Sequence, residues 1–131
     1  MPQITALDHL VLTVRSIPET VAFYRDVLGM QARQFTGADR TIRWALFFGA
    51  QKINLHQAGA EFEPKARVAQ PGSADLCFLS DEPVTSWVIR LTALEVAIEE
   101  GPVRRSGAVG PIESVYVRDP DGNLIEISVP S

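Results

Sequence analysis

The order of the apolar segments constrains the fold of this chain more than any other feature, because the same five-element order occurs twice. Between residues 4 and 57 the pattern predicts a strand, a helix and three further strands. Residues 74–129 predict the same series again. The segment 58–73 holds two Gly, two Pro and mixed charge, which is typical of a connecting loop. We therefore expect one α+β domain over residues 1–131, made of two βαβββ modules, 4–57 and 74–129, joined by that loop.

Short signals mark the ends of these elements. Ser16 followed by Glu19 is a capping box at the start of the first helix, and Gly29 supplies the left-handed residue that ends it. Asp81 is the expected N-cap of the second helix. The strands are expected at residues 4–14, 31–35, 42–48, 52–57, 75–79, 95–99, 112–118 and 123–129.

Composition excludes several classes of protein. The formal net charge is -4, and no run of Lys or Arg indicates binding to nucleic acid or to an anionic membrane. The first residues lack the basic and apolar stretches of a signal peptide or a membrane span. The single cysteine, Cys77, excludes an internal disulfide, so we expect a cytoplasmic protein. Because its neighbours are apolar, we interpret Cys77 as a core residue.

Isolated polar side chains stand in strands that are otherwise apolar: His9, Asn54, His56, Asp75 and Glu126. Neighbouring side chains of a strand point to opposite faces, so each strand would turn its apolar residues to a core and these groups to the other side. A carboxylate in a buried strand, such as that of Glu126, needs a partner, and a cation is the simplest one.

The internal repeat pairs these positions. Aligning the prolines of the two helices brings His9 within one residue of Asp75, and aligning the turns before the last strands sets Asn54 against Glu126. If the modules pair symmetrically around a cleft, four of the groups converge: His9, His56, Asp75 and Glu126. Two imidazoles and two carboxylates are a suitable shell for Zn, Fe(II), Mn, Ni or Co, with Asn54 as a substitute ligand. Each residue taken singly can also be a hydrogen-bonded structural residue.

Three motifs carry a family resemblance that covers nearly the whole chain. They are Asp8-His9-Leu10-Val11-Leu12-Thr13-Val14, then Phe23-Tyr24 with Val27-Leu28-Gly29-Met30, and Asp119-Pro120-Asp121-Gly122-Asn123-Leu124-Ile125-Glu126. With them the chain resembles the vicinal oxygen chelate superfamily, which contains glyoxalase I, fosfomycin-resistance enzymes, bleomycin-resistance proteins and extradiol dioxygenases. Residues 52–56, 61–66, 71–78 and 100–103 resemble, more closely, the glyoxalase-domain-containing protein 5 type and its bacterial relatives.

The resemblance implies that the two modules form a cupped mixed sheet around a divalent metal, commonly in a homodimer. Its metal-binding members take ligands from the first, fifth and eighth strands, which are His9, Asp75 and Glu126 in this chain. Glyoxalase I adds a fourth-strand ligand, which would be Asn54 or His56. The chain departs from the family pattern at two positions, since Asp75 stands where a His is usual and Asn54 stands where glyoxalase I has Glu.

The expected function is that of a metal-dependent glyoxalase-like enzyme. By resemblance it would be a lactoylglutathione-lyase-like isomerase or lyase that stabilises an enediolate on the metal, with Glu126 or Asp75 as the catalytic base. Its substrate would be a small molecule, such as an adduct of glutathione or another thiol. Cations in loop-like segments could hold a substrate carboxylate or provide solubilising charge: Lys65, Arg67, Arg104 and Arg105.

Two other functions stay open. Extradiol dioxygenase or thiol-transferase chemistry could use the same centre, and an iron site would need His56 in place of a fifth-strand His. The chain could instead be a metal-free, bleomycin-resistance-like protein that binds a drug or another small molecule. The aromatic walls of its cleft would then come from Trp44, Phe47, Phe48 and Trp87, although core packing also explains these residues.

Overall fold

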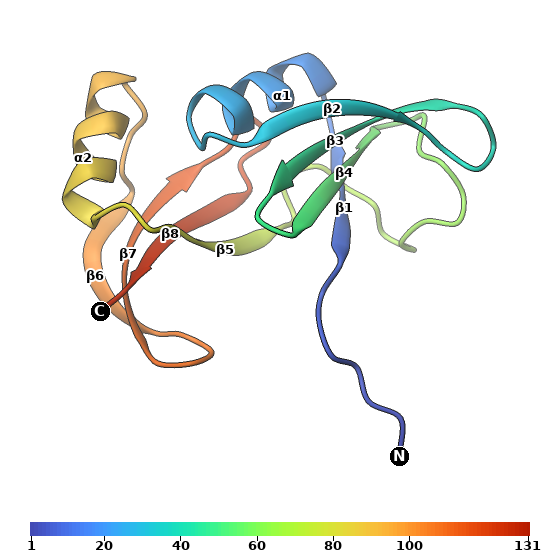
Figure 1. Cartoon of the computed structure of the whole chain (residues 1–131). Coiled ribbons are helices and arrows are strands. Elements are labelled where there is room, and N and C mark those ends of the chain that lie inside the picture. The colour runs from blue at the N-terminus through green and yellow to red at the C-terminus, as the bar shows by residue number, and fades with distance from the viewer. The chain divides into compact units, whose positions relative to one another are not determined.

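The computed structural model describes all 131 residues, and their contacts divide the chain into two compact units, residues 1–71 and 72–131. Each unit contains one strand, one helix and three further strands, in the predicted order (Figure 1). The prediction of two βαβββ modules with an α+β fold is therefore confirmed. Neither of the ten-residue helices has the length or the apolar content needed to cross a membrane.

The first unit is a four-stranded sheet with one helix packed on it. Its strand order is β1-β4-β3-β2, with β1 parallel to β4 and the other pairs antiparallel. Its elements are β1 (His9–Val14), α1 (Ile17–Asp26), β2 (Gln31–Thr36), β3 (Ile42–Phe48) and β4 (Gln51–Gln57). The core between α1 and the sheet contains Leu12, Val14, Val21, Tyr24, Leu46, Ile53 and Leu55.

The second unit repeats this topology. Its strand order is β5-β8-β7-β6. Again the first strand in the sequence, β5, is parallel to the last, β8, and the other pairs are antiparallel. Its elements are β5 (Asp75–Leu79), α2 (Val84–Ala93), β6 (Glu100–Ser106), β7 (Pro111–Arg118) and β8 (Leu124–Pro130). The core includes Val84, Leu91, Val115, Val117, Ile125 and Ile127.

The predicted helix ends are right for α1 and wrong for α2. The Ser16 hydroxyl accepts a hydrogen bond from the N–H of Glu19 at 3.3 Å, and Gly29 has a φ of 76°. Helix α2 instead begins after Pro83, which has no side-chain hydrogen bond to offer. Asp81 lies exposed in the turn before it. Proline already has the φ that a helix start requires, so no acidic cap is used here.

The first strand is shorter than predicted. It begins at His9 rather than at residue 4, because its parallel partner β4 begins only at Gln51. The side-chain amide of Gln51 still reaches back to the carbonyl of Leu7, at 2.8 Å. The residues before β1 have no strand beside them and run away from the sheet as an extended segment (Figure 1).

The strand predicted at residues 95–99 is wrong, because the strand lies later and begins at Glu100. Gly101 and the proline after it disfavour a strand in the sequence pattern. The structure accommodates them with a register shift between Glu100 and Val103. Glycine is required at 101, since its φ is 107° and a Cβ there would lie 2.4 Å from the carbonyl oxygen of Ser114.

The turn before β8 ties together the starts of two neighbouring strands. Asp119 is 5% exposed, and its carboxylate accepts hydrogen bonds from the N–H groups of Asp121 and Asn123, both at 2.9 Å. It also accepts one from the side-chain amide of Asn123, at 2.7 Å. The Asn123 Oδ1 in turn accepts a hydrogen bond from the N–H of Ala74, at 2.8 Å. The turn therefore sets where β5 begins against β8, and with it the position of Asp75.

We predict that Asp119→Ala lowers the free energy of unfolding by about 2–4 kcal/mol, because it removes charge-assisted hydrogen bonds and leaves buried donors unpaired. Urea denaturation measures this change. The matched control is Asp81→Ala, which removes an exposed carboxylate and should change the free energy by less than about 0.5 kcal/mol. Equal losses in the two variants would contradict the structural role of this turn.

Candidate functional site

Each sheet has one face covered by its helix and another that we call the open face. Strand alternation and the cross-strand register assign residues to these faces. The first open face carries His9, Val11, Thr13, Lys52, Asn54, His56, Arg43, Ala45, Phe47, Gln31, Arg33 and Phe35. The second carries Asp75, Cys77, Leu79, Leu124, Glu126, Ser128, Ser114, Tyr116 and Arg118. All five polar residues singled out from the strands thus lie on open faces, as their alternation predicts.

His9 stands at the start of β1 with its side chain 42% exposed. Its Nδ1 lies 2.8 Å from Oδ2 of Asp8. A carboxylate beside Nδ1 favours the tautomer with its proton there, which leaves the Nε2 lone pair available as a ligand. The carboxylate also orients the ring, so the pair has the chemistry of a metal-binding histidine and its supporting acid.

Glu126 is half-buried in the middle of β8. Its Oε2 accepts hydrogen bonds from the hydroxyl of Ser114 at 2.6 Å and from that of Ser128 at 3.2 Å. The two serine oxygens are themselves 2.7 Å apart, and both residues are fully buried. The sequence indicates that the Glu126 carboxylate needs a polar partner, and two hydroxyls supply part of it. They also hold this carboxylate in one orientation.

The register makes His9 and Asn54 the counterparts of Asp75 and Glu126. In the first unit, Asn54 lies two residues beyond the position opposite His9. In the second unit, Glu126 lies two residues beyond the position opposite Asp75. Each pair therefore shares a face with its Cα atoms roughly 8 Å apart. This confirms the pairing of positions predicted by aligning the two modules.

The structure does not bring His56 to His9. His56 lies opposite Thr13, four residues along the parallel strand from His9, so the two Cα atoms are roughly 14 Å apart. Metal–nitrogen bonds of about 2 Å cannot join both rings to one ion across that span. The predicted set of ligands therefore loses His56, and Asn54 is the fourth-strand residue nearer to His9. In neither unit by itself do three His, Cys, Asp or Glu side chains form a metal-binding group.

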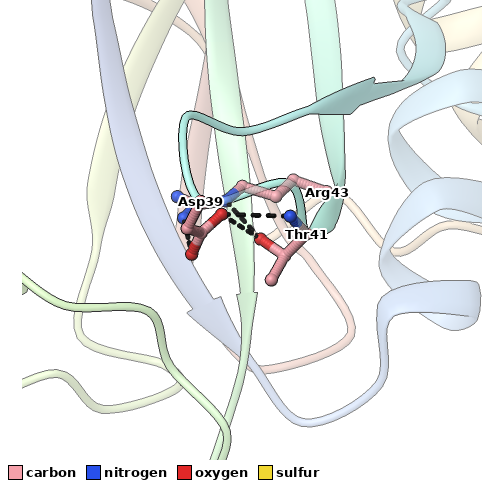
Figure 2. Close-up of polar contacts among 3 residues, drawn as sticks. All are labelled: Asp39, Thr41 and Arg43. Carbon is pink, nitrogen blue, oxygen red and sulfur yellow. Dashed lines mark hydrogen bonds and ion pairs between the residues drawn. The ribbon is translucent and has the colours of Figure 1, made fainter.

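The hairpin between β2 and β3 fixes Arg43 at the first open face. Its guanidinium lies 2.9 Å from Oδ2 of Asp39 and 3.2 Å from the hydroxyl of Thr41 (Figure 2). Hydrogen bonds from the hydroxyl and N–H of Thr41, together with Arg43, lower the pKa of Asp39 to about 2. The ion pair therefore persists at neutral pH. A Cβ at position 37 would lie 2.5 Å from Nε of Arg43, so a larger residue there would shift the guanidinium.

His56 is covered by a residue of the linker loop. The Arg43 guanidinium lies 3.9 Å from the centre of the Phe62 ring, and that ring meets His56 edge-on at 5.4 Å. His56 is only 5% exposed, and its Nδ1 has no hydrogen-bond partner. Loss of solvent, followed by the nearby charge of Arg43, lowers the pKa of His56. His56 is therefore a neutral, buried residue at physiological pH.

The interpretation of Cys77 as a core residue is wrong, because Cys77 is exposed on the second open face. Alternation explains this position: Leu76 and Phe78 turn to the core, and the residue between them turns outward. Cys77 lies directly opposite Glu126, and its Sγ is 3.2 Å from the Ser128 hydroxyl. Desolvation of the thiolate raises the pKa of Cys77, so the thiol stays protonated near neutral pH.

A cavity of about 610 Å³ opens on the same face of the second unit. Apolar side chains including Leu79 and Ile112 line it, together with Cys77, Glu126 and Arg105. The Arg105 charge is already compensated, since its guanidinium is 3.1 Å from a glutamate oxygen and 3.0 Å from a tyrosine hydroxyl. A mainly apolar hollow with one carboxylate in its wall is suited to a small organic molecule.

The structure decides between a cleft wall and core packing for the four aromatic residues named from the sequence. Trp44 and Phe48 lie on the helix face of their sheet, and Trp87 belongs to α2, where its indole N–H donates to a serine hydroxyl at 2.8 Å. Phe47 is on the open face, and Phe35 lies on the same face, four residues along β2 from the position opposite Phe47. The sequence reasoning missed Phe35, although it alternates in its strand like the other open-face residues.

Burial of His56 predicts that the protein becomes less stable in acid. The pKa of His56 in the folded state lies below its ordinary value of about 6.5, so the unfolded chain binds more protons below that pH. The free energy of unfolding then decreases as the pH falls from about 6.5 towards the folded pKa, by at most about 1.4 kcal/mol per pH unit. Urea denaturation at pH 7.5 and 5.5 should show a smaller loss for His56→Leu than for the wild type. An identical pH dependence of the two proteins would contradict this prediction.

Comparison with known proteins agrees with this geometry. The model of the Glyoxalase/Bleomycin resistance protein/Dioxygenase superfamily matches residues 6–127. Virulence protein STM3117 of Salmonella typhimurium is 55% identical over 125 residues, which are 95% of this chain and 84% of that protein. Its crystal structure matches with a TM-score of 0.93, covering 99% of this chain and 100% of that one.

The names of two further relatives state a domain type or an activity. Glyoxalase domain-containing protein RDO1 of Mycosarcoma maydis is 53% identical over 95% of this chain and 68% of that protein. The crystal structure of lactoylglutathione lyase from Agrobacterium tumefaciens matches with a TM-score of 0.70 and 26% identity, covering 97% of this chain and 95% of that one. With a family match over nearly its whole length, the chain belongs to the Glyoxalase/Bleomycin resistance protein/Dioxygenase superfamily.

Proposed function

We propose that the chain is a metal-dependent glyoxalase-like enzyme in which His9, Asp75 and Glu126 hold one divalent cation. The observation that carries this proposal is the repeated register, which gives His9 with Asn54 and Asp75 with Glu126 the same spacing on the open faces of two equivalent sheets. For the site to form, the two open faces must meet, within one chain or across a homodimer.

The donor groups fit a divalent transition metal. His9 offers Nε2 because Asp8 engages its other nitrogen. Asn54 has a buried Oδ1 without a hydrogen-bond partner, which is an available oxygen donor beside it. One imidazole and two carboxylates suit Zn, Ni, Mn, Fe or Co, and their chemistry alone does not select among these. When bound, such a cation acts as a Lewis acid that polarises two adjacent oxygens of a substrate.

The carboxylates supply the proton-transfer groups. Glu126 is oriented by the hydroxyls of Ser114 and Ser128, which engage Oε2. An oriented carboxylate within reach of a substrate C–H can accept a proton at one carbon and return it at the next, which is the step that isomerisation of a hemithioacetal requires. Asp75 is exposed and could take the same role. The apolar cavity beside Glu126 would limit the access of water to the reacting carbon.

We predict that protein first stripped with a chelator binds one equivalent of Zn²⁺ or Mn²⁺ per chain, measured by isothermal titration calorimetry. Glu126→Ala and His9→Ala each remove a proposed ligand, and each should weaken binding by at least about tenfold. His56→Leu is the control, because the register separates His56 from His9. Equal weakening by His56→Leu and His9→Ala would contradict the proposed ligand set.

The reaction itself is tested with the hemithioacetal of methylglyoxal and glutathione, in the presence of each of the five metals in turn. We expect metal-dependent formation of the thioester product in the wild type and its loss in Glu126→Gln. No turnover with any metal would exclude lactoylglutathione-lyase-like isomerisation. Oxygen uptake with catechols would then favour ring cleavage, and a chain that binds no metal in the titration would favour a small-molecule-binding protein.

A further inference from the structure

Two cations on the first open face have no acidic partner. Lys52 and Arg33 form no ion pair, although the chain has an excess of four acidic side chains over basic ones. Arg33 donates only to the side-chain amide of Gln31. In an acidic protein, cations that stay together without a carboxylate mark a place where an external anion is attracted.

Both cations rest on aromatic rings instead. The Lys52 Nζ lies 4.1 Å from the centre of the Phe35 ring and 5.8 Å from that of Phe47. The Arg33 Cζ lies 4.9 Å from the centre of the Phe47 ring. Lys52 is on β4 and Phe35 is on β2, so the lysine side chain crosses the open face of β3 between them. The rings hold both charges within one small area.

Two other cations of this unit, one beside a ring and one in the linker loop, are neutralised. Arg43 is paired with Asp39, and Lys65 is within 3.4 Å of Glu61 and 3.5 Å of Glu63. These positions cannot bind an added anion without first losing a partner. The lysine that sequence reasoning offered for a substrate carboxylate, Lys65, is therefore a poorer candidate than Lys52.

We propose that Lys52, Arg33, Phe35 and Phe47 form a binding site for a small organic anion, with a carboxylate or phosphonate on the two cations and an apolar or aromatic body against the rings. This anion site would bind part of the substrate of the proposed enzyme, so its role in catalysis rests on the proposed function. In the register, Lys52 lies directly opposite His9. The Lys52 Nζ itself reaches away from β1 towards Phe35, so an anion bound there would lie on the same open face as His9 but across β3 from it, and a substrate that engages both must extend along this face. The substrate is therefore an anion, and its anionic end is bound by the first unit.

The test uses the purified full-length protein, as isolated and after chelator treatment, with phenylphosphonate and benzoate as probes and neutral benzamide as the uncharged comparison. Backbone amide shifts in ¹H–¹⁵N NMR spectra report binding. We expect saturable shifts at Lys52, Arg33 and Phe35 with the two anions and none with benzamide, in both protein preparations. Lys52→Gln should weaken binding about tenfold, the size expected from losing one charge-assisted hydrogen bond.

The matched control is Lys65→Gln, which changes the net charge by the same amount in the same unit and should leave the affinity within about twofold. Arg33→Gln is a second variant, so the result does not depend on one variant folding, and its effect should resemble that of Lys52→Gln. Equal weakening by Lys52→Gln and Lys65→Gln, or no saturable shifts, would overturn the site. Anion binding that disappears with the chelator but ignores Lys52→Gln would overturn it too, while supporting the metal centre.

Discussion

The parallel pairing of the first and last strands in each unit decides where every candidate functional group lies. A slip of one residue in this pairing would move a whole strand's side chains to the opposite face. Side-chain contacts at the ends of the strands hold the register. The Gln57 side chain donates to the carbonyl of Arg15 at 2.6 Å in the first unit, and Asn123 accepts from the N–H of Ala74 in the second. Through these contacts, residues without any catalytic chemistry position His9 and Glu126.

The duplicated topology carries two chemically different open faces. The first has two histidines and several cations above aromatic rings, including Lys52 and Arg33. The second has Asp75 and Glu126 beside buried hydroxyls and a mainly apolar cavity. The two units therefore share one topology and differ in the charge and polarity of their outward residues. Since the core residues alternate with these positions, the outward set can change without disturbing the core.

The sequence predicts the elements well where local chemistry is decisive. The capping of α1 by Ser16 and the left-handed Gly29 follow from side chains close in sequence, and the structure confirms both. Prediction fails where a distant partner decides. β1 starts at His9 because β4 starts at Gln51, and β6 tolerates Gly101 because the strand beside it approaches too closely for a side chain. Neither fact is encoded in the few residues around it.

For the candidate site, the sequence by itself determined which side chains face away from the core, because strand alternation depends only on neighbouring residues. It thereby identified His9, Asn54, Asp75 and Glu126, and the repeat correctly paired them. Only the tertiary structure decided the distances: His56 shares the face of His9 but lies four residues along from it, and Lys52 lies opposite His9. The physical reason is that alternation sets the direction of a side chain, whereas hydrogen bonding between strands distant in sequence sets its neighbours.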